Sequence, residues 1–207
     1  LRVWGRGVIA ILGGRISVEG TPAQPPFLLV SNHLSYVDVF ALAAVAAPVF
    51  IAKAEVRSWW LIGLLARHME VIFIDREDLK DVVRVKELVF GAIQRGHGVH
   101  IFAEGGISQT CQVAPFKPAL LDVAARNNYP VHHVTITYKT PQNSPPPSKV
   151  VAWIGGKPFM AHLVRLAGSC GFEVSLTFGE APVVCRDRKA LAEQLTQAVR
   201  ARFVPIE

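Results

Sequence analysis

The chain has 207 residues, of which 51% are hydrophobic and 18% are charged, which is enough apolar material for one domain spanning residues 1–207. It contains no run of about 18 uninterrupted apolar residues, so no membrane-spanning helix is expected. Its three cysteines lack the paired spacing of a disulfide framework or a zinc site. The net charge of +6 favours anionic partners, but the charges are not interleaved with aromatic residues as in a nucleic-acid groove.

Strand-like and helix-like segments alternate along the chain. Residues 3–16 contain two arginines and four glycines and resemble neither a secretion signal nor a spanning helix. The alternation that follows predicts an α/β fold with a mostly parallel or mixed central sheet flanked by helices. The expected strands are 27–30, 49–52, 71–74, 99–102, 131–136, 150–154 and 174–178; the expected helices are 36–47, 56–67, 82–93, 119–126 and 189–203, with a proline-rich loop at 140–147.

Polar residues directly follow three of the expected strands. Asn32-His33 follows the first strand, Asp75-Arg76 the third and Glu104-Gly105-Gly106 the fourth. Ligands of open α/β sheets collect at the carboxyl ends of parallel strands. If these strands are parallel neighbours, a base, a cation and a glycine-rich turn lie at one edge of the sheet.

His33 and Asp38 are separated by four residues at the end of the first strand. Ser35 is placed to cap a helix that begins at Tyr36, so a turn can bring the imidazole and the carboxylate within hydrogen-bond reach. A carboxylate on one ring nitrogen leaves the other to take a proton from a hydroxyl group. The alternative is structural: Ser35 and Asp38 have the spacing of a capping box, and His33 is then an ordinary core histidine.

Four blocks in this order resemble the glycerolipid acyltransferases, the lysophosphatidate (1-acylglycerol-3-phosphate) acyltransferase family. Asn-His-Leu-Ser-Tyr-Val-Asp (32–38) is similar to the first block, and Val-Ile-Phe-Ile-Asp-Arg (71–76) to the second. Phe-Ala-Glu-Gly-Gly-Ile-Ser (102–108) is similar to the third, and Tyr-Pro-Val-His-His-Val (129–134) to the fourth. Order and spacing agree across residues 27–140, which is far more specific than one His and one Asp.

The resemblance implies a glycerol-3-phosphate acyltransferase-like fold and a role in phospholipid biosynthesis. Its reaction is the transfer of a fatty acyl group from acyl carrier protein (acyl-ACP) or coenzyme A (acyl-CoA) to the hydroxyl of a lysolipid. No cofactor is implied beyond this thioester co-substrate. His33 is expected to be the general base, and Asp38 to orient its ring.

The resemblance also implies substrate-binding residues. Arg76 is expected to pair with the acceptor's phosphate or another anionic headgroup, with a surface arginine offset by neighbouring carboxylates as the alternative. Glu104 is expected either to hydrogen-bond an acceptor hydroxyl or only to start a helix. Lys53 matches a basic position of the family that can meet phosphate or extend into solvent. Gly105 and Gly106 are expected to offer backbone N–H groups to the oxyanion.

Three departures from the family pattern concern the acceptor. Ile107 stands where many members have Arg, and Ala103 and His133 replace prolines of the third and fourth blocks. The following Val-Ala-Pro-Phe-Lys (113–117) looks like the version found in relatives that act on other lysolipids. Lyso-aminolipids, such as lyso-ornithine lipid, therefore remain candidate acceptors beside lysophosphatidate.

Residues 57–68 predict contact with an anionic membrane surface. Trp59 and Trp60 precede an aliphatic run, and Arg57, Arg67 and His68 flank it, as at a lipid interface; an amphipathic core helix is the alternative. We expect association with the cytoplasmic face, either peripheral or through an anchor outside this chain, because the sequence begins with Leu rather than Met and the unpaired cysteines suit a reducing compartment.

Other functions fit the sequence less well. Adjacent histidines on a strand, His132 and His133, point to opposite faces and do not form a metal site. A hydrolase that uses the same histidine with water is an alternative, although no Gly-x-Ser-x-Gly motif is present. A lipid-binding relative that has lost the chemistry is another, and the intact His33 and Asp38 argue against it.

Overall fold

A seven-stranded sheet forms the centre of the computed structural model, which describes residues 1–55, 71–75, 77–155 and 158–206. The strand order is β1-β7-β6-β2-β5-β3-β4, and all neighbours are parallel except β6 and β7. The predicted α/β fold with a mixed sheet is confirmed. The strands are β1 (Gly14–Glu19), β2 (Phe27–Ser31), β3 (Val49–Lys53), β4 (Val71–Ile74), β5 (Gly98–Phe102), β6 (Val131–Lys139) and β7 (Phe172–Phe178).

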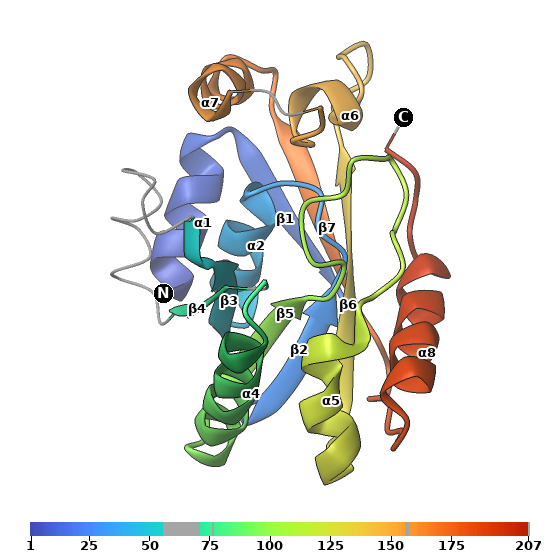
Figure 1. Ribbon diagram of the computed structural model, residues 1–207. Helices are drawn as coiled ribbons and strands as arrows, with labels where there is room; N and C mark the ends of the chain where they lie inside the picture. The colour runs from blue at the N-terminus through green and yellow to red at the C-terminus, as the bar shows by residue number, and fades with distance from the viewer. Residues whose placement is uncertain (56–70, 76, 156–157, 207) are drawn as a thin grey trace.

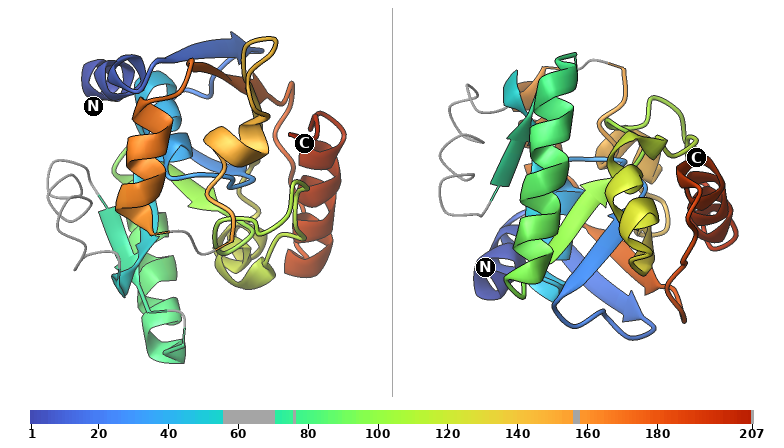
Figure 2. Two further views of the ribbon diagram at one scale, coloured as in Figure 1. Left: turned by 90° about the horizontal axis from the view of Figure 1, so that it is seen from above. Right: turned by 60° about the horizontal axis from the view of Figure 1, so that its bottom comes forward.

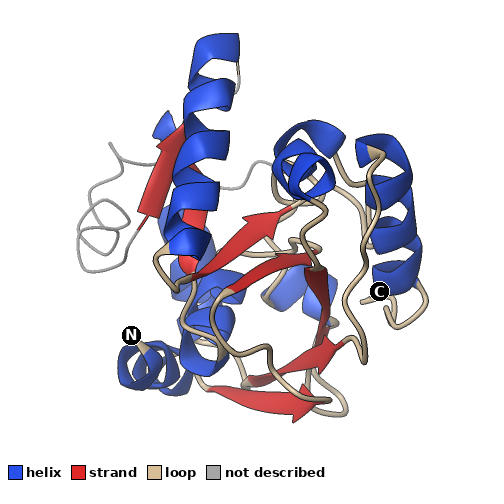
Figure 3. Cartoon of the chain, turned by 90° about the horizontal axis from the view of Figure 1, so that it is seen from below, coloured by secondary structure: helices blue, strands red, loops and turns tan. Residues whose placement is uncertain are grey.

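Helices cover both faces of the sheet (Figure 1 and Figure 2), and the view from below shows the strands lying between the helix layers (Figure 3). One face carries α1 (Arg2–Ile11), α2 (Val37–Val45), α6 (Pro147–Val150) and α7 (Phe159–Ala167); the other carries α4 (Leu79–Gln94), α5 (Pro118–Asn127) and α8 (Arg188–Arg200).

Strand β2 lies in the middle of the sheet and is buried on both sides. Phe27 and Leu29 belong to the apolar core under α1 and α2, whereas Leu28 and Val30 belong to the core under α4, α5 and α8. This division follows from the alternation of side chains along a strand. It explains why β2 is a continuous apolar run in the sequence rather than an alternating one.

Two elements near the N-terminus were not expected from the sequence. Helix α1 packs closely on α2 because Gly5 lacks a side chain: a Cβ there would lie 2.6 Å from the carbonyl oxygen of Phe40 and 2.7 Å from the nitrogen of Ala44. Strand β1 then pairs in parallel with β7, with Gly14 opposite Phe172. Gly5 and Gly14 therefore serve close packing, because a Cβ at either position would meet a neighbouring atom at less than 3 Å.

The strand expected at 150–154 is wrong. Val150 is instead the last residue of the short helix α6, which a proline at its first position favours, and residues 151–154 continue without a partner strand. Its backbone contacts a loop, since Trp153 N donates to Leu34 O at 2.9 Å. Helix α7 was also not expected. The helix expected at 56–67, with the tryptophans of 57–68, lies outside the described residues.

None of the helices in the described part of the chain is both long and apolar enough to cross a membrane.

Candidate active site

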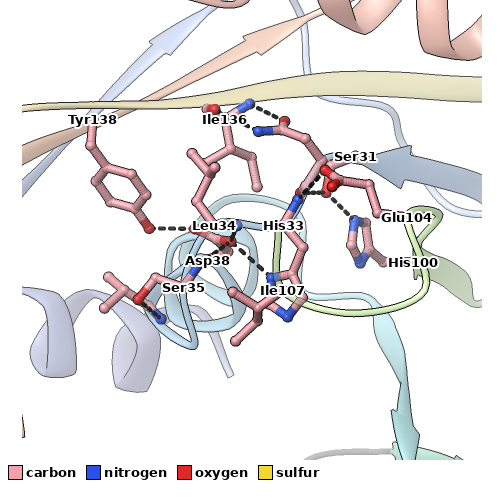
Figure 4. A network of polar contacts seen from close by, with 12 residues as sticks. Ser31, His33, Leu34, Ser35, Asp38, His100, Glu104, Ile107, Ile136 and Tyr138 are labelled. Atoms are coloured by element: carbon pink, nitrogen blue, oxygen red, sulfur yellow. Dashed lines mark hydrogen bonds and ion pairs between the residues drawn. The ribbon is translucent and has the colours of Figure 1, made fainter. Parts of the chain in front are cut away.

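The carboxyl ends of β2 and β5 bring the first and third sequence blocks together. The two strands are parallel neighbours with Ser31 opposite Phe102, so His33 and Glu104 leave the sheet at the same edge. His33 N donates to Glu104 Oε1 at 2.9 Å, which ties the two blocks directly (Figure 4). The expectation that these strand ends share one edge is confirmed.

The His33 ring and the Asp38 carboxylate are hydrogen-bonded, with 2.9 Å between Nδ1 and Oδ2. Asp38 lies in the first turn of α2 and is fully buried, while the side chain of His33 is 12% exposed. Asp38 Oδ2 also accepts the N–H groups of Leu34 at 2.7 Å and Ser35 at 3.0 Å. One carboxylate thus satisfies the loop backbone, as a capping residue does, and also orients the imidazole.

Tyr138 on β6 completes the surroundings of Asp38, because its hydroxyl donates to Oδ1 (Figure 4). Asp38 therefore faces only donors: two backbone N–H groups, a phenol and the His33 ring. This arrangement suits an ionised carboxylate, which in turn requires a hydrogen on His33 Nδ1. The other ring nitrogen, Nε2, is left as a proton acceptor.

The His33 ring is held in place by further contacts. It stacks on Phe102 with 3.7 Å between ring centroids and 18° between planes. His33 O accepts the N–H of Ser108 at 2.7 Å, so the third block closes around His33 and Ile107 is held beside it (Figure 4). The histidine is therefore fixed through its ring, its amide and its carbonyl.

Glu104 contacts the main chain on both sides of the site. Oε1 accepts His33 N, and Oε2 accepts Ala114 N at 3.3 Å. Burial raises the pKa of Glu104 to about 7, and these two bonds oppose the rise. The contacts show Glu104 supporting the loop that carries His33; its bond to an acceptor hydroxyl stays a prediction.

The glycine turn needs one correction. Gly105 N donates to Phe102 O at 3.0 Å within the turn, so it is not a free donor for an oxyanion. Gly105 has φ +85°, which favours glycine, and the aliphatic end of Lys117 lies against it. In the described part of the chain no acceptor is recorded for Gly106 N–H, so this is the donor of the pair that remains for the chemistry.

Of the two predicted cations, only Lys53 lies in the described part of the chain. Lys53 ends β3 beside β5, is exposed, and is opposite Ile74 of β4. It therefore lies at the same edge as His33. Arg76, two residues beyond Ile74, lies outside the described residues. Phosphate binding by either residue stays a prediction.

Three residues near the site were not assigned from the sequence. The Asn32 side chain makes two hydrogen bonds to the backbone of Ile136 on β6: Asn32 Nδ2 donates to Ile136 O at 2.9 Å, and Ile136 N donates to Asn32 Oδ1 at 2.8 Å. His100 lies fully buried behind Phe102 and bonds Ser31 Oγ at 3.0 Å; burial, together with nearby His33, lowers its pKa to about 3, so it is neutral. Tyr138 is the third. The sequence signal is a polar residue within an otherwise apolar strand for His100 and Tyr138, and a polar residue directly after such a strand for Asn32.

Known proteins resemble this chain over most of its length. Residues 15–139 match the acyltransferase family, which is more than half of the chain. The lyso-ornithine lipid O-acyltransferase of Rhodobacter capsulatus is 32% identical over 204 residues, covering 93% of this chain and 71% of that protein. The 1-acyl-sn-glycerol-3-phosphate acyltransferase of Neisseria meningitidis is 35% identical over 136 residues, covering 65% of this chain and 53% of that protein.

A solved structure has the same fold. The crystal structure of the 1-acyl-sn-glycerophosphate acyltransferase from Thermotoga maritima aligns with a TM-score of 0.68 at 22% identity, covering 98% of this chain and 79% of that chain. The predicted resemblance is confirmed by the sequence matches and the predicted fold by this alignment. The chain belongs to the acyltransferase family and is an acyltransferase.

Proposed function

We propose that this protein transfers a fatty acyl group from a thioester, on acyl carrier protein or coenzyme A, to the free hydroxyl of a lysolipid. The observation that carries the proposal is the set of donors around Asp38, which leaves His33 Nε2 as a proton acceptor at the carboxyl edge of the sheet. A hydroxyl is a weak nucleophile at neutral pH, so its attack needs such a base.

The reaction then follows in two steps. His33 Nε2 takes the hydroxyl proton as the lysolipid oxygen bonds to the thioester carbonyl carbon, and Asp38 stabilises the resulting imidazolium. The tetrahedral oxyanion collapses, the carbon–sulfur bond breaks, and the imidazolium returns the proton to the thiolate. Gly106 N–H is the proposed donor to the oxyanion, and loss of one such donor typically costs about 100- to 1000-fold in kcat.

The acceptor headgroup is proposed from Ile107. This apolar side chain is held beside His33, at the position where many relatives have Arg. A phosphomonoester headgroup needs cations around it, whereas an amino-acid headgroup carries its own positive charge. The Rhodobacter relative is named for lyso-ornithine lipid, so we favour a lyso-aminolipid over lysophosphatidate as the acceptor.

The outer faces of α1 and α7 support association with an anionic membrane. Val3 and Ile11 of α1 are 85% and 83% exposed, and Met160 and Val164 of α7 are 55% and 68% exposed. The two helices carry three arginines (Arg2, Arg6 and Arg165) and no acidic residue. Apolar faces with only basic charges fit a phospholipid interface. The three cysteines are free, as suits the cytoplasmic face.

The test uses purified protein with a labelled acyl group offered on both carriers, a panel of lysolipids, and detection of products by lipid mass spectrometry. His33→Ala is compared with His97→Ala, a control at the opposite end of β5. Diacyl lipid made by the wild type and the control but lost with His33→Ala supports the proposal. Free fatty acid instead of diacyl lipid would mean hydrolysis. Lysolipid binding without turnover would mean a lipid-binding protein, and both results would overturn the transferase.

A further inference from the structure

Tyr138 is the partner of the Asp38 oxygen that faces away from His33. The His33 ring and the amides of Leu34 and Ser35 all bond Oδ2, whereas Tyr138 bonds Oδ1. Among the described residues no other donor to Oδ1 is recorded. The phenol is therefore the contact that controls the charge on that half of the carboxylate.

The position of Tyr138 is fixed by the sheet. The Asn32 side-chain amide makes two hydrogen bonds to the backbone of Ile136, which hold the end of β2 against β6. Tyr138 is two residues further along β6, on the same face as Ile136, and its side chain points to Asp38 (Figure 4). Both Tyr138 and Asp38 are almost completely buried, so their hydrogen bond is shielded from water.

Tyr138 can only donate in this site. Burial and the neighbouring Asp38 raise the pKa of Tyr138 well above its ordinary value, so its hydroxyl keeps its proton at all working pH values. A donor on Oδ1 draws negative charge away from Oδ2, and Oδ2 is the oxygen that holds the His33 ring. The strength of the His33–Asp38 pair thus depends on a residue 100 positions along the chain from Asp38.

We propose that Tyr138 is a positioning residue that sets, through Asp38, how tightly the His33 ring holds a proton, and that keeps this ring aimed at the acceptor. The inference rests on the proposed role of His33. Without the phenol, Asp38 holds a protonated imidazole more tightly, and the ring keeps its extra proton to higher pH. Glu104 and His100 also face His33, but neither is hydrogen-bonded to Asp38, so their contacts stay in place when the phenol is removed.

The test is Tyr138→Phe, which removes one oxygen and keeps the ring. We expect the His33 ring signals in NMR spectra of histidine-labelled protein to titrate about one pH unit higher, and the acid limb of the kcat/KM profile to move with them. At pH 7 kcat should fall about tenfold, with KM for both substrates within about twofold. Tyr129→Phe, which loses only a bond to Pro26 O at 3.2 Å, is the matched control and should shift neither.

The outcomes separate this inference from the proposed function. An unchanged His33 titration in Tyr138→Phe, or a loss of kcat without a shift of the acid limb, would overturn the role of Tyr138. If His33→Gln, used to assign the ring signal, keeps full transferase activity, the proposed role of His33 as the base fails while the NMR shift still decides the coupling. Should Tyr138→Phe not fold, 3-fluorotyrosine at position 138 is a stronger donor and must shift the titration in the opposite direction.

Discussion

Asp38→Asn removes the charge from the proposed catalytic pair and changes little else in size or shape. The asparagine oxygen can still accept the N–H groups that Oδ2 accepts, namely those of Leu34, Ser35 and His33. Its NH₂ group can donate to the oxygen of Tyr138. The substitution therefore tests the charge rather than the geometry.

The expected loss follows from the distance between the charges. His33 Nδ1 and Asp38 Oδ2 are 2.9 Å apart in a buried site, which puts the charge centres of imidazolium and carboxylate at about 4 Å. At an effective dielectric constant of about 20, this attraction is worth about 4 kcal/mol. Since about 1.4 kcal/mol changes a rate tenfold, we expect kcat to fall about a thousandfold and KM to stay within about threefold.

The assay is acyl transfer to the preferred lysolipid at saturating thioester. Asp187→Asn is the control, because Asp187 caps α8 through Lys189 N and Ala190 N, both at 2.8 Å, and Asn caps a helix equally well. His33→Ala combined with Asp38→Asn should be no slower than the slower single variant, as expected for residues that act as a unit. A folded Asp38→Asn protein within tenfold of the wild type would refute the argument from charge.

Three further predictions test other parts of the structure. Burial raises the pKa of Glu104 from 4.5 to about 7, so its neutral form stabilises the fold at low pH and this stabilisation is lost as the pH rises through this window. Across the window, the free energy of unfolding of the wild type should fall by about 3 kcal/mol relative to that of Glu104→Gln. Unfolding free energies that change in parallel with pH in the two proteins would contradict this. Gly5→Ala should destabilise the protein by about 1–3 kcal/mol in urea unfolding because a Cβ meets Phe40 O. Gly7→Ala, in open space on the same helix, should stabilise it by about 0.5–1 kcal/mol. Equal changes in the two variants would show that α1 does not pack as described. Ile107→Arg should raise kcat/KM for lysophosphatidate relative to lyso-ornithine lipid about tenfold, and an unchanged ratio would remove Ile107 from acceptor selection.

The central strands could be predicted from the sequence because burial leaves a local signature. β2, β3 and β5 differ from expectation by one residue at one end, since each is an apolar run that only His100 of β5 interrupts. The apolar edge strand β4 occurs where it was expected. The edge strand β1 could not be predicted. Its residues are half-buried or exposed, and its pairing with β7 joins Gly14 to Phe172 across most of the chain.

In the active site, too, the local contacts could be predicted from the sequence and the contacts that depend on strand register could not. The contact between His33 and Asp38 follows from local spacing, because one turn at the start of α2 brings them together. The contact between Asp38 and Tyr138 depends on the register of β6 against β2, which no local pattern reveals. Gly105 was misjudged because a glycine in a turn often uses its own N–H to close that turn.

The donors around Asp38 link the chemistry to the sheet. A carboxylate buried in this way keeps its charge only if its oxygens are hydrogen-bonded. Two of its donors are local amides, but Tyr138 reaches Asp38 only when β6 lies beside β2 in the register fixed by Asn32 and Ile136. A slip of β6 by one residue would turn Tyr138 to the other face of the sheet. The pairing of β2 with β6 therefore decides whether His33 has an oriented carboxylate beside it, and a variant that loosens this pairing should lose kcat before it loses its helices.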